Sequence, residues 1–485
     1  MSVRTAALWS MGTQYICFAI NFLVSVIVSR FYLTPAEVGL FSVALAAAMV
    51  VSILQDFGIS RYVAGQKELN AETIRTASSV SVIFAWGIAL VVMALGWPLA
   101  TFYEEPRLIP LILIIGASYF ALPFSIVPCA LLTRAMNFKA LLVVNVGSAC
   151  AFATTAILMA MQGYSASSLA WAQVALFVTK AILAQMHAPA QLSIPFHLKG
   201  SGPMLRFGSA SSVLFVSGSI GTRTPDLIIG ALLTTTAVGL FSRATALADQ
   251  LRTLVSGAIT SVFYPTFARL RDQGEDLGPY YIRVVSGYCA ITWPAMLALS
   301  VASEPLVYLL YGDKWMAAAP LLKWAALAQM FFVALPLHID IPILLGRIKP
   351  LIGYNIAETS ASLITLVIAA RWGVEWAALS RIGYGVLWYL IYIRFMQSLI
   401  RFDWLPLLSV YLKSAAVSFA AIIPFLLSYN WWRVPLELGF SGLLLCTLTG
   451  IGLWLAALYG IRHPARTEVS EITAAAFGAL RLLRA

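Results

Sequence analysis

Residues 33–44 read LTPAEVGLFSVA, and residues 233–244 read LTTTAVGLFSRA. At a shift of 200 positions, eight of the twelve residues are identical and no gap is needed. A shared run of VGLFS at a long, fixed separation indicates an internal repeat, with chance similarity between two apolar segments as the alternative. The repeat predicts a chain built from two similar halves.

The composition places most of the chain in hydrocarbon. Of 485 residues, 61% are hydrophobic and 11% are charged, whereas soluble domains are about half apolar and about a quarter charged. The first apolar segment is not followed by a small-residue cleavage site, so we expect it to be a retained helix. The five cysteines contain no CxxC pair and the four histidines are scattered, so the sequence predicts packed thiols and no metal site.

Apolar segments of spanning length recur along the chain. A membrane-spanning helix needs about 20 mostly apolar residues. About fourteen segments meet this description, at roughly 8–30, 38–60, 77–100, 108–131, 140–161, 166–186, 207–231, 237–259, 284–306, 317–341, 351–370, 376–397, 405–428 and 436–460. The predicted fold is therefore an all-α integral membrane protein.

The loop lysines and arginines predict the orientation. One set of loops and ends holds 19 of them, and the other set holds five. Because cytoplasmic loops carry the excess of basic residues, both termini are expected to face the cytoplasm. The net charge of +11 is then a topology signal, and a nucleic-acid partner is not expected.

Both copies of the repeat fall at the hairpin between the first and second helices of a six-helix unit, in the same orientation. This indicates a parallel repeat, with two six-helix lobes related by an axis along the membrane normal. The segment between them is rich in Pro, Gly and Ser, which is typical of a linker. The predicted organisation is an N-terminal lobe at 1–186, a cytoplasmic linker at 187–206, a second lobe at 207–400, two additional helices at 401–460 and a cytoplasmic tail at 461–485.

Motifs of enzyme chemistry are missing from the sequence. There is no GxxxxGK[ST] loop, HExxH, GxSxG or DxD. Beside a repeat of transporter type, this favours a transporter over an enzyme.

Most charges within predicted spans lie in the seventh and eighth helices. Arg223 with Asp226, and Asp249 with Arg252, are three residues apart and share a helix face. They either line a wet cavity or neutralise each other during insertion. Arg243 has no acidic residue three or four positions away. A planar guanidinium suits a phosphate or an acidic sugar, so Arg243 is the leading candidate for substrate binding, with Arg223 and Arg252 beside it.

Other charges near or within spans are weaker candidates. Arg30 ends the first helix and either contacts substrate or extends to the interface. Asp56, Asp340 and Glu358 join Asp226 and Asp249 as candidates for coupling or gating. Sodium or proton coupling is one expectation for these carboxylates, and a local hydrogen bond is the alternative.

Four motifs together resemble the polysaccharide-transporter family of the multidrug/oligosaccharidyl-lipid/polysaccharide exporter superfamily. They are LTPAEVGLFSVA, TPDLIIGALLTTTAVGLFSRA (224–244), FYPTFARLRD (263–272) and LVYLLYGDKW (306–315). The resemblance implies two lobes around a V-shaped cavity lined by the first, second, seventh and eighth helices. It also implies alternating access that flips undecaprenyl-pyrophosphate-linked oligosaccharides across the bacterial inner membrane.

The family resemblance also implies partners. These are the lipid-linked oligosaccharide, membrane lipids, and polymerase and export machinery of an exopolysaccharide, capsule or O-antigen pathway. A multidrug/cation antiporter of the same superfamily is one alternative, although an acidic cavity would suit it better than these basic candidates. A membrane polymerase or ligase is another, although such enzymes usually carry a larger outer loop than this chain offers.

Overall fold

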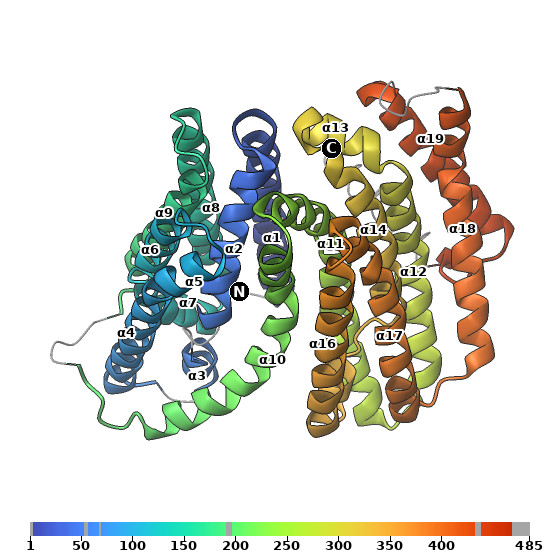
Figure 1. Ribbon diagram of the computed structural model, residues 1–485. Helices are drawn as coiled ribbons and strands as arrows, with labels where there is room; N and C mark the ends of the chain where they lie inside the picture. Colours follow the sequence, from blue (N-terminus) through green and yellow to red (C-terminus); the bar gives the residue numbers. More distant parts are fainter. Residues whose placement is uncertain (1–2, 53–56, 67–68, 191–195, 432–437, 468–485) are drawn as a thin grey trace, which may run out of the picture. The chain divides into compact units, whose positions relative to one another are not determined.

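The computed structural model describes residues 3–52, 57–66, 69–190, 196–431 and 438–467 (Figure 1). All regular elements within these residues are helices, which confirms the predicted all-α class. The chain divides into two compact units, Met1–Ser242 and Arg243–Ala485. The division falls inside a single helix, and the lobe and linker boundaries expected from the sequence stay a prediction.

The first unit contains ten complete helices within its described residues. They are α1 (Val3–Ile27), α2 (Pro35–Ser52), α3 (Ile59–Gly65), α4 (Ala71–Ala94), α5 (Gly96–Phe102), α6 (Leu108–Ser118), α7 (Pro123–Arg134), α8 (Phe138–Met161), α9 (Ser167–His187) and α10 (Gly202–Leu232). A π-helical turn, Val28–Tyr32, continues α1. The first two turns of α11 (Thr235–Gln273) complete this unit.

The second unit continues α11 and adds the remaining helices. They are α12 (Leu277–Val301), α13 (Ser303–Tyr311), a 3-10 helix at Asp313–Ala318, α14 (Ala319–Ala334), α15 (Asp340–Leu344), α16 (Ile348–Ala370), α17 (Val374–Ile400), α18 (Trp404–Trp431) and α19 (Gly439–Gly460). Within this unit α12 packs against α14 and α18, and α17 packs against α14 and α16.

Every predicted span overlaps at least one helix of the described residues, but the count of fourteen is not confirmed. Among the described residues, ten helices are long and apolar enough to cross a membrane, or eleven if the bent pair α6–α7 is one span. The predicted spans on α10, α11 and α17 are not among them. For α11 the reason is plain, because Arg243, Asp249 and Arg252 interrupt its apolar sequence.

Proline shapes two of the spans. The predicted fourth span is broken between Ser118 and Pro123, and the two halves meet at 44°. The predicted tenth span, 317–341, ends early, because α14 stops at Ala334. Leu335 precedes Pro336, and a residue before proline is disfavoured in the α conformation.

The two copies of the repeat lie against each other at the start of α2 and α11. A Cβ atom added to Gly39 would overlap the carbonyl oxygen of Thr235, and one added to Gly239 would overlap that of Pro35. The same added atoms would lie 2.8 Å from the Gly239 nitrogen and 3.0 Å from the Gly39 nitrogen. The contact is therefore reciprocal, and only glycine at both positions allows the two backbones to approach this closely.

Polar groups of the repeat support the same contact. The Ser42 hydroxyl donates a hydrogen bond to the Ser242 hydroxyl at 3.3 Å. Thr34 donates to the Glu37 carboxylate through its backbone nitrogen at 2.7 Å and its hydroxyl at 2.8 Å. In the second copy the Thr234 hydroxyl accepts from the first turn of α11. These threonines cap their helices, which explains why both copies retain them.

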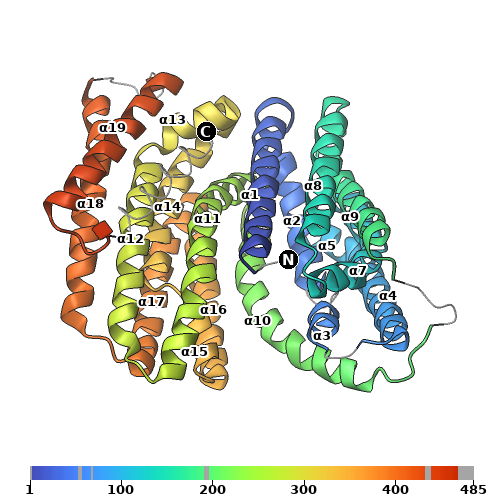
Figure 2. The ribbon, with the colours of Figure 1, turned by 180° about the vertical axis from the view of Figure 1, so that it is seen from behind.

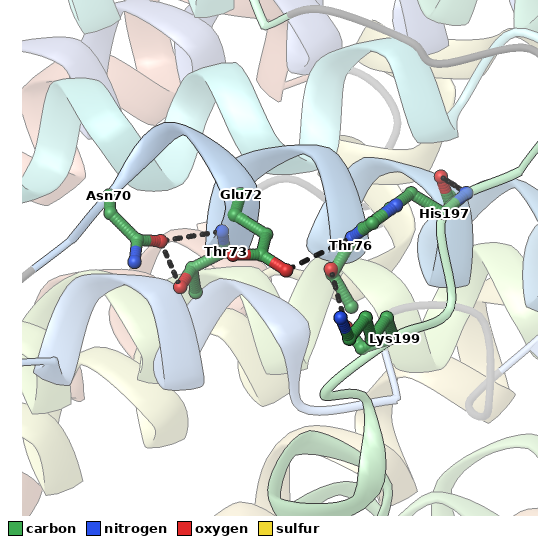
Figure 3. A network of polar contacts seen from close by, with 7 residues as sticks. Asn70, Glu72, Thr73, Thr76, His197 and Lys199 are labelled. Carbon is green, nitrogen blue, oxygen red and sulfur yellow. Dashed lines mark hydrogen bonds and ion pairs between the residues drawn. The ribbon is translucent and has the colours of Figure 1, made fainter.

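Part of the predicted linker is bound to α4 (Figure 3). The backbone nitrogen of His197 donates to the Ser79 hydroxyl at 3.0 Å, and the Thr76 hydroxyl donates to the carbonyl oxygen of Lys199 at 3.2 Å. The His197 imidazole also lies 3.3 Å from the Glu72 carboxylate. Three contacts thus hold this segment along the first three turns of one helix.

We predict that alanine at Gly39 or Gly239 destabilises the protein. Alanine improves helix propensity by about 1 kcal/mol, but the overlap with backbone forces the helices apart, which costs about 1–3 kcal/mol in overpacked sites. The measurement is the thermal unfolding midpoint of the purified protein in detergent. Gly87→Ala in α4 is the control, because no atom lies within 4 Å of the added Cβ. Equal midpoints for all three variants would contradict the contact.

Candidate functional site

The charged residues of α11 join a polar residue of α14 in the second unit. Arg252 Nη2 lies 3.6 Å from Asp249 Oδ1, so the predicted pair forms. The same oxygen accepts a hydrogen bond from Gln329 Nε2 at 2.5 Å. Gln329 is buried, whereas Arg252 and Asp249 keep 33% and 47% of their side-chain exposure. The Asp249 carboxylate is therefore held by two partners in this unit and remains partly exposed.

Arg243 lies on α11 directly after the repeat contact. Its neighbour Ser242 contacts Ser42, and Val43 occupies the position equivalent to Arg243 in the first copy. The guanidinium is partly buried and lies close enough to the Tyr311 hydroxyl to interact with it electrostatically. A cation at this position distinguishes the second copy of the repeat from the first, and its fork of N–H donors suits an anion.

The other predicted substrate and gating residues differ in how far the structure describes them. Asp226 is half-buried in α10, but the side chain of its predicted partner Arg223 lies outside the described residues. Asp56 also lies outside them. Arg30 sits in the π-helical turn after α1, with its guanidinium 5.9 Å from the centre of the Phe31 ring.

Glu358 and Asp340 have different surroundings. The Tyr384 hydroxyl donates a hydrogen bond to Glu358 across α16 and α17, and the Arg381 guanidinium lies 5.2 Å from the centre of the Tyr384 ring. Glu358 therefore has a local partner. A local hydrogen bond is one of the two alternatives that the sequence left open for this carboxylate, and ion coupling is the other. Asp340 begins the short helix α15 and is half-buried.

An aromatic and polar cluster in the second unit carries no signal in the sequence. The His338 ring packs edge-on against Trp388 at 4.7 Å and Tyr392 at 5.1 Å. The Tyr392 hydroxyl in turn donates to Asn355 on α16. Gln329 is also a residue that the sequence does not single out. A lone amide in an apolar helix does not indicate which distant carboxylate it contacts. Within the described part of the chain, no group of three His, Cys, Asp or Glu could hold a metal ion.

A charged pair between α5 and α6 lies outside the spans. Arg107 Nε donates to the Glu105 carboxylate at 2.8 Å, and Nη2 donates to the other oxygen at 2.8 Å. These bonds lower the pKa of Glu105. Arg107 is 66% exposed, so the pair contributes little to stability.

Two curated relatives match about two thirds of the chain. The lipopolysaccharide biosynthesis protein WzxC of Escherichia coli strain K12 is 23% identical over 67% of each chain. The succinoglycan biosynthesis transport protein ExoT of Rhizobium meliloti strain 1021 is 25% identical over 66% of this chain and 65% of its own length.

Two solved structures share the fold. Lipid II flippase MurJ in an inward closed conformation gives a TM-score of 0.74 at 14% identity, over 96% of this chain and 100% of that chain. An inward-facing multidrug resistance transporter of the MATE family gives a TM-score of 0.60 at 13% identity, over 82% and 96%. At these identities the likeness shows the fold alone.

The family model described as a polysaccharide biosynthesis protein matches residues 27–320. This region spans more than half of the chain and includes both copies of the repeat and the charged stretch of α11. The chain is a multi-pass membrane protein, and it belongs to the polysaccharide biosynthesis protein family.

Proposed function

We propose that this protein moves an oligosaccharide linked to undecaprenyl pyrophosphate from the cytoplasmic to the periplasmic leaflet of a bacterial inner membrane. The observation that carries the proposal is the family match over residues 27–320, together with relatives named for lipopolysaccharide biosynthesis and succinoglycan transport. Both termini face the cytoplasm, and the chain acts without catalysing a covalent reaction. The polymerase and export proteins of the same pathway take the translocated unit.

The physical problem for such a protein is desolvation. A pyrophosphate and several sugars lose their hydration in hydrocarbon, which costs far more than a polyprenyl tail can offset. Cationic and hydrogen-bonding groups within spanning helices supply replacement contacts while the tail stays in lipid. Arg243 suits this role, because it is a partly buried guanidinium at the start of the charged stretch of α11. Arg223, Arg252 and Arg30 are further anion contacts in the proposal.

The transport cycle follows from two states of the same chain. Alternating access exposes the substrate contacts to each side of the membrane in turn. A sodium or proton gradient supplies the direction, and Asp249 is the leading group for coupling. Its carboxylate is partly exposed and joins α11 to α14 through Gln329. A change in its charge therefore alters a contact between two helices.

A gene deletion tests the function itself. In the host strain, loss of the protein should leave complete lipid-linked repeat units on the cytoplasmic face and remove exported polymer. Translocated but unpolymerised units on the periplasmic face would instead favour a polymerase or ligase. Normal polymer with increased sensitivity to cationic drugs would favour a multidrug antiporter.

We predict that Arg243→Ala fails to restore polymer export in the deletion strain, while Arg243→Lys restores it in part. A charge-assisted hydrogen bond contributes about 1.5–3 kcal/mol, so transport should fall by about tenfold to a hundredfold. Lysine keeps the charge but loses the bidentate geometry. Arg394→Ala, at an exposed arginine of α17, is the control. Full export with Arg243→Ala at normal protein level would remove Arg243 from the substrate contacts.

We predict that Asp249→Asn abolishes transport without unfolding the protein. Asparagine keeps an oxygen that accepts from Gln329, but it cannot carry a proton or balance a sodium ion. The measurement is the translocation of lipid-linked oligosaccharide in vesicles under an imposed sodium or proton gradient. Glu358→Gln is the comparison, because Glu358 has a local partner in Tyr384. If Asp249→Asn transports normally and still responds to the gradient, Asp249 has only a structural role.

A further inference from the structure

A polar pocket lies within the first unit, between α1, α8 and α9. Its volume is about 430 Å³, and Gln14, Asn21, Asn145 and Lys180 line it together with Cys17. The three helices pack side by side, α1 against α8 and α8 against α9, as the view from behind shows (Figure 2). The pocket therefore lies inside one compact unit and involves none of the α11 residues discussed above.

The polar side chains that line the pocket distinguish it from a packing defect between apolar helices. Among the described residues, no hydrogen bond or ion pair engages the side chains of Gln14, Asn21, Asn145 or Lys180. None of the described residues that line the pocket is acidic. Three amides and one ammonium group thus converge on a single space and leave their hydrogen-bonding capacity for whatever fills it.

The depth of the pocket makes this arrangement costly. All three helices have the length and composition of membrane spans, and Asn21 lies near the middle of the span Trp9–Tyr32. An unsatisfied polar group in hydrocarbon costs several kcal/mol. Polar and charged groups in spanning helices are accordingly rare and usually serve a ligand or a water-filled path. The pocket is expected to be occupied by a polar group in the membrane.

The charge of the pocket selects the type of occupant. Among the described residues of the lining, Lys180 alone carries a charge. A second cation, Lys139, lies 5.6 Å from the centre of the Trp9 ring. It directly follows Phe138, which also lines the pocket. Tryptophan favours the membrane interface, so this end of the pocket lies near the head groups. The potential favours an anion that enters from that level.

We propose that this pocket binds the anionic, hydroxyl-bearing head group of a membrane lipid, with Lys180 on the anion and the amides of Gln14, Asn21 and Asn145 on its hydroxyls. A phospholipid with a glycerol head group and a polyprenyl-phosphate-linked sugar both have this chemistry. The inference concerns binding alone, and it stands whether or not the chain transports an oligosaccharide. An ammonium group suits a single phosphate as a point charge.

Cys17 supplies a direct measurement, because it lines the same pocket. The full-length protein is placed in phosphatidylcholine vesicles, alone or mixed with phosphatidylglycerol or with an undecaprenyl-phosphate-linked sugar. Alkylation of Cys17 by a neutral maleimide is then followed by mass spectrometry of its peptide. We predict that an anionic lipid slows Cys17 labelling at least threefold, and that Lys180→Gln removes this protection. The ratio of rates within each variant is compared, because Lys180 itself changes thiol reactivity.

The controls separate the site from general effects of membrane charge. Lys413→Gln removes a lysine from α18, in the second unit, and should keep the protection. Inorganic phosphate in the buffer tests a free anion. Protection by phosphatidylglycerol alone assigns the site to bulk phospholipid, and protection by the undecaprenyl-phosphate-linked sugar alone assigns it to a polyprenyl-linked lipid. Either result supports the proposal.

Two results overturn the proposal. One is an equal rate of Cys17 labelling in all membranes, and the other is protection that persists in Lys180→Gln. Should Lys180→Gln fail to fold, the unsubstituted protein still decides the first point through the comparison between membranes. The polymer-export assay is read separately, so the absence of lipid protection in the unsubstituted protein, with intact export, would refute this site without refuting the proposed transport.

Discussion

The close backbone contact between Gly39 and Gly239 is the constraint on which the arrangement of the two repeat copies in the first unit depends. Because neither residue has a side chain, α2 and α11 meet at their backbones, and the Ser42–Ser242 hydrogen bond continues the contact one turn further on. Arg243 follows directly. It is the first residue of the second unit, so the repeat contact ends the first unit where the charged stretch of α11 begins.

This contact explains why the repeat is visible in the sequence at all. Each copy supplies half of a reciprocal interface, so a change in one copy has to be accommodated by the other. Thr34 and Thr234 are shared because both cap a helix, whereas Glu37 has no acidic counterpart in the second copy, where Ala237 takes its place. The sequence predicted two related segments at equivalent places. It could not predict that they touch, because identity between segments carries no information about distance.

The candidate site divides in the same way. The Asp249–Arg252 pair follows from helical spacing alone and forms as predicted. Gln329, 80 residues further along the chain, completes it through packing that no local pattern encodes. Hydrophobicity predicted fourteen spans, whereas ten or eleven of the described helices pass the length-and-composition test, and α10, α11 and α17 fall outside it. The charged residues Arg243, Asp249 and Arg252, which are the candidates for function, also lower the hydrophobicity by which α11 would be recognised as a span.

The polar groups of the apolar helices in this protein are of two kinds. Glu358 has its partner in Tyr384, so its burial is already compensated and requires no ligand. The amides and the ammonium group around Lys180 have no such compensation within the described protein, and they face a pocket of about 430 Å³. Charge in a spanning helix is therefore a weaker indication of a binding site than charge without an internal partner. The sequence shows which spanning helices carry a charge, but only the packed helices show whether that charge has a partner within the protein.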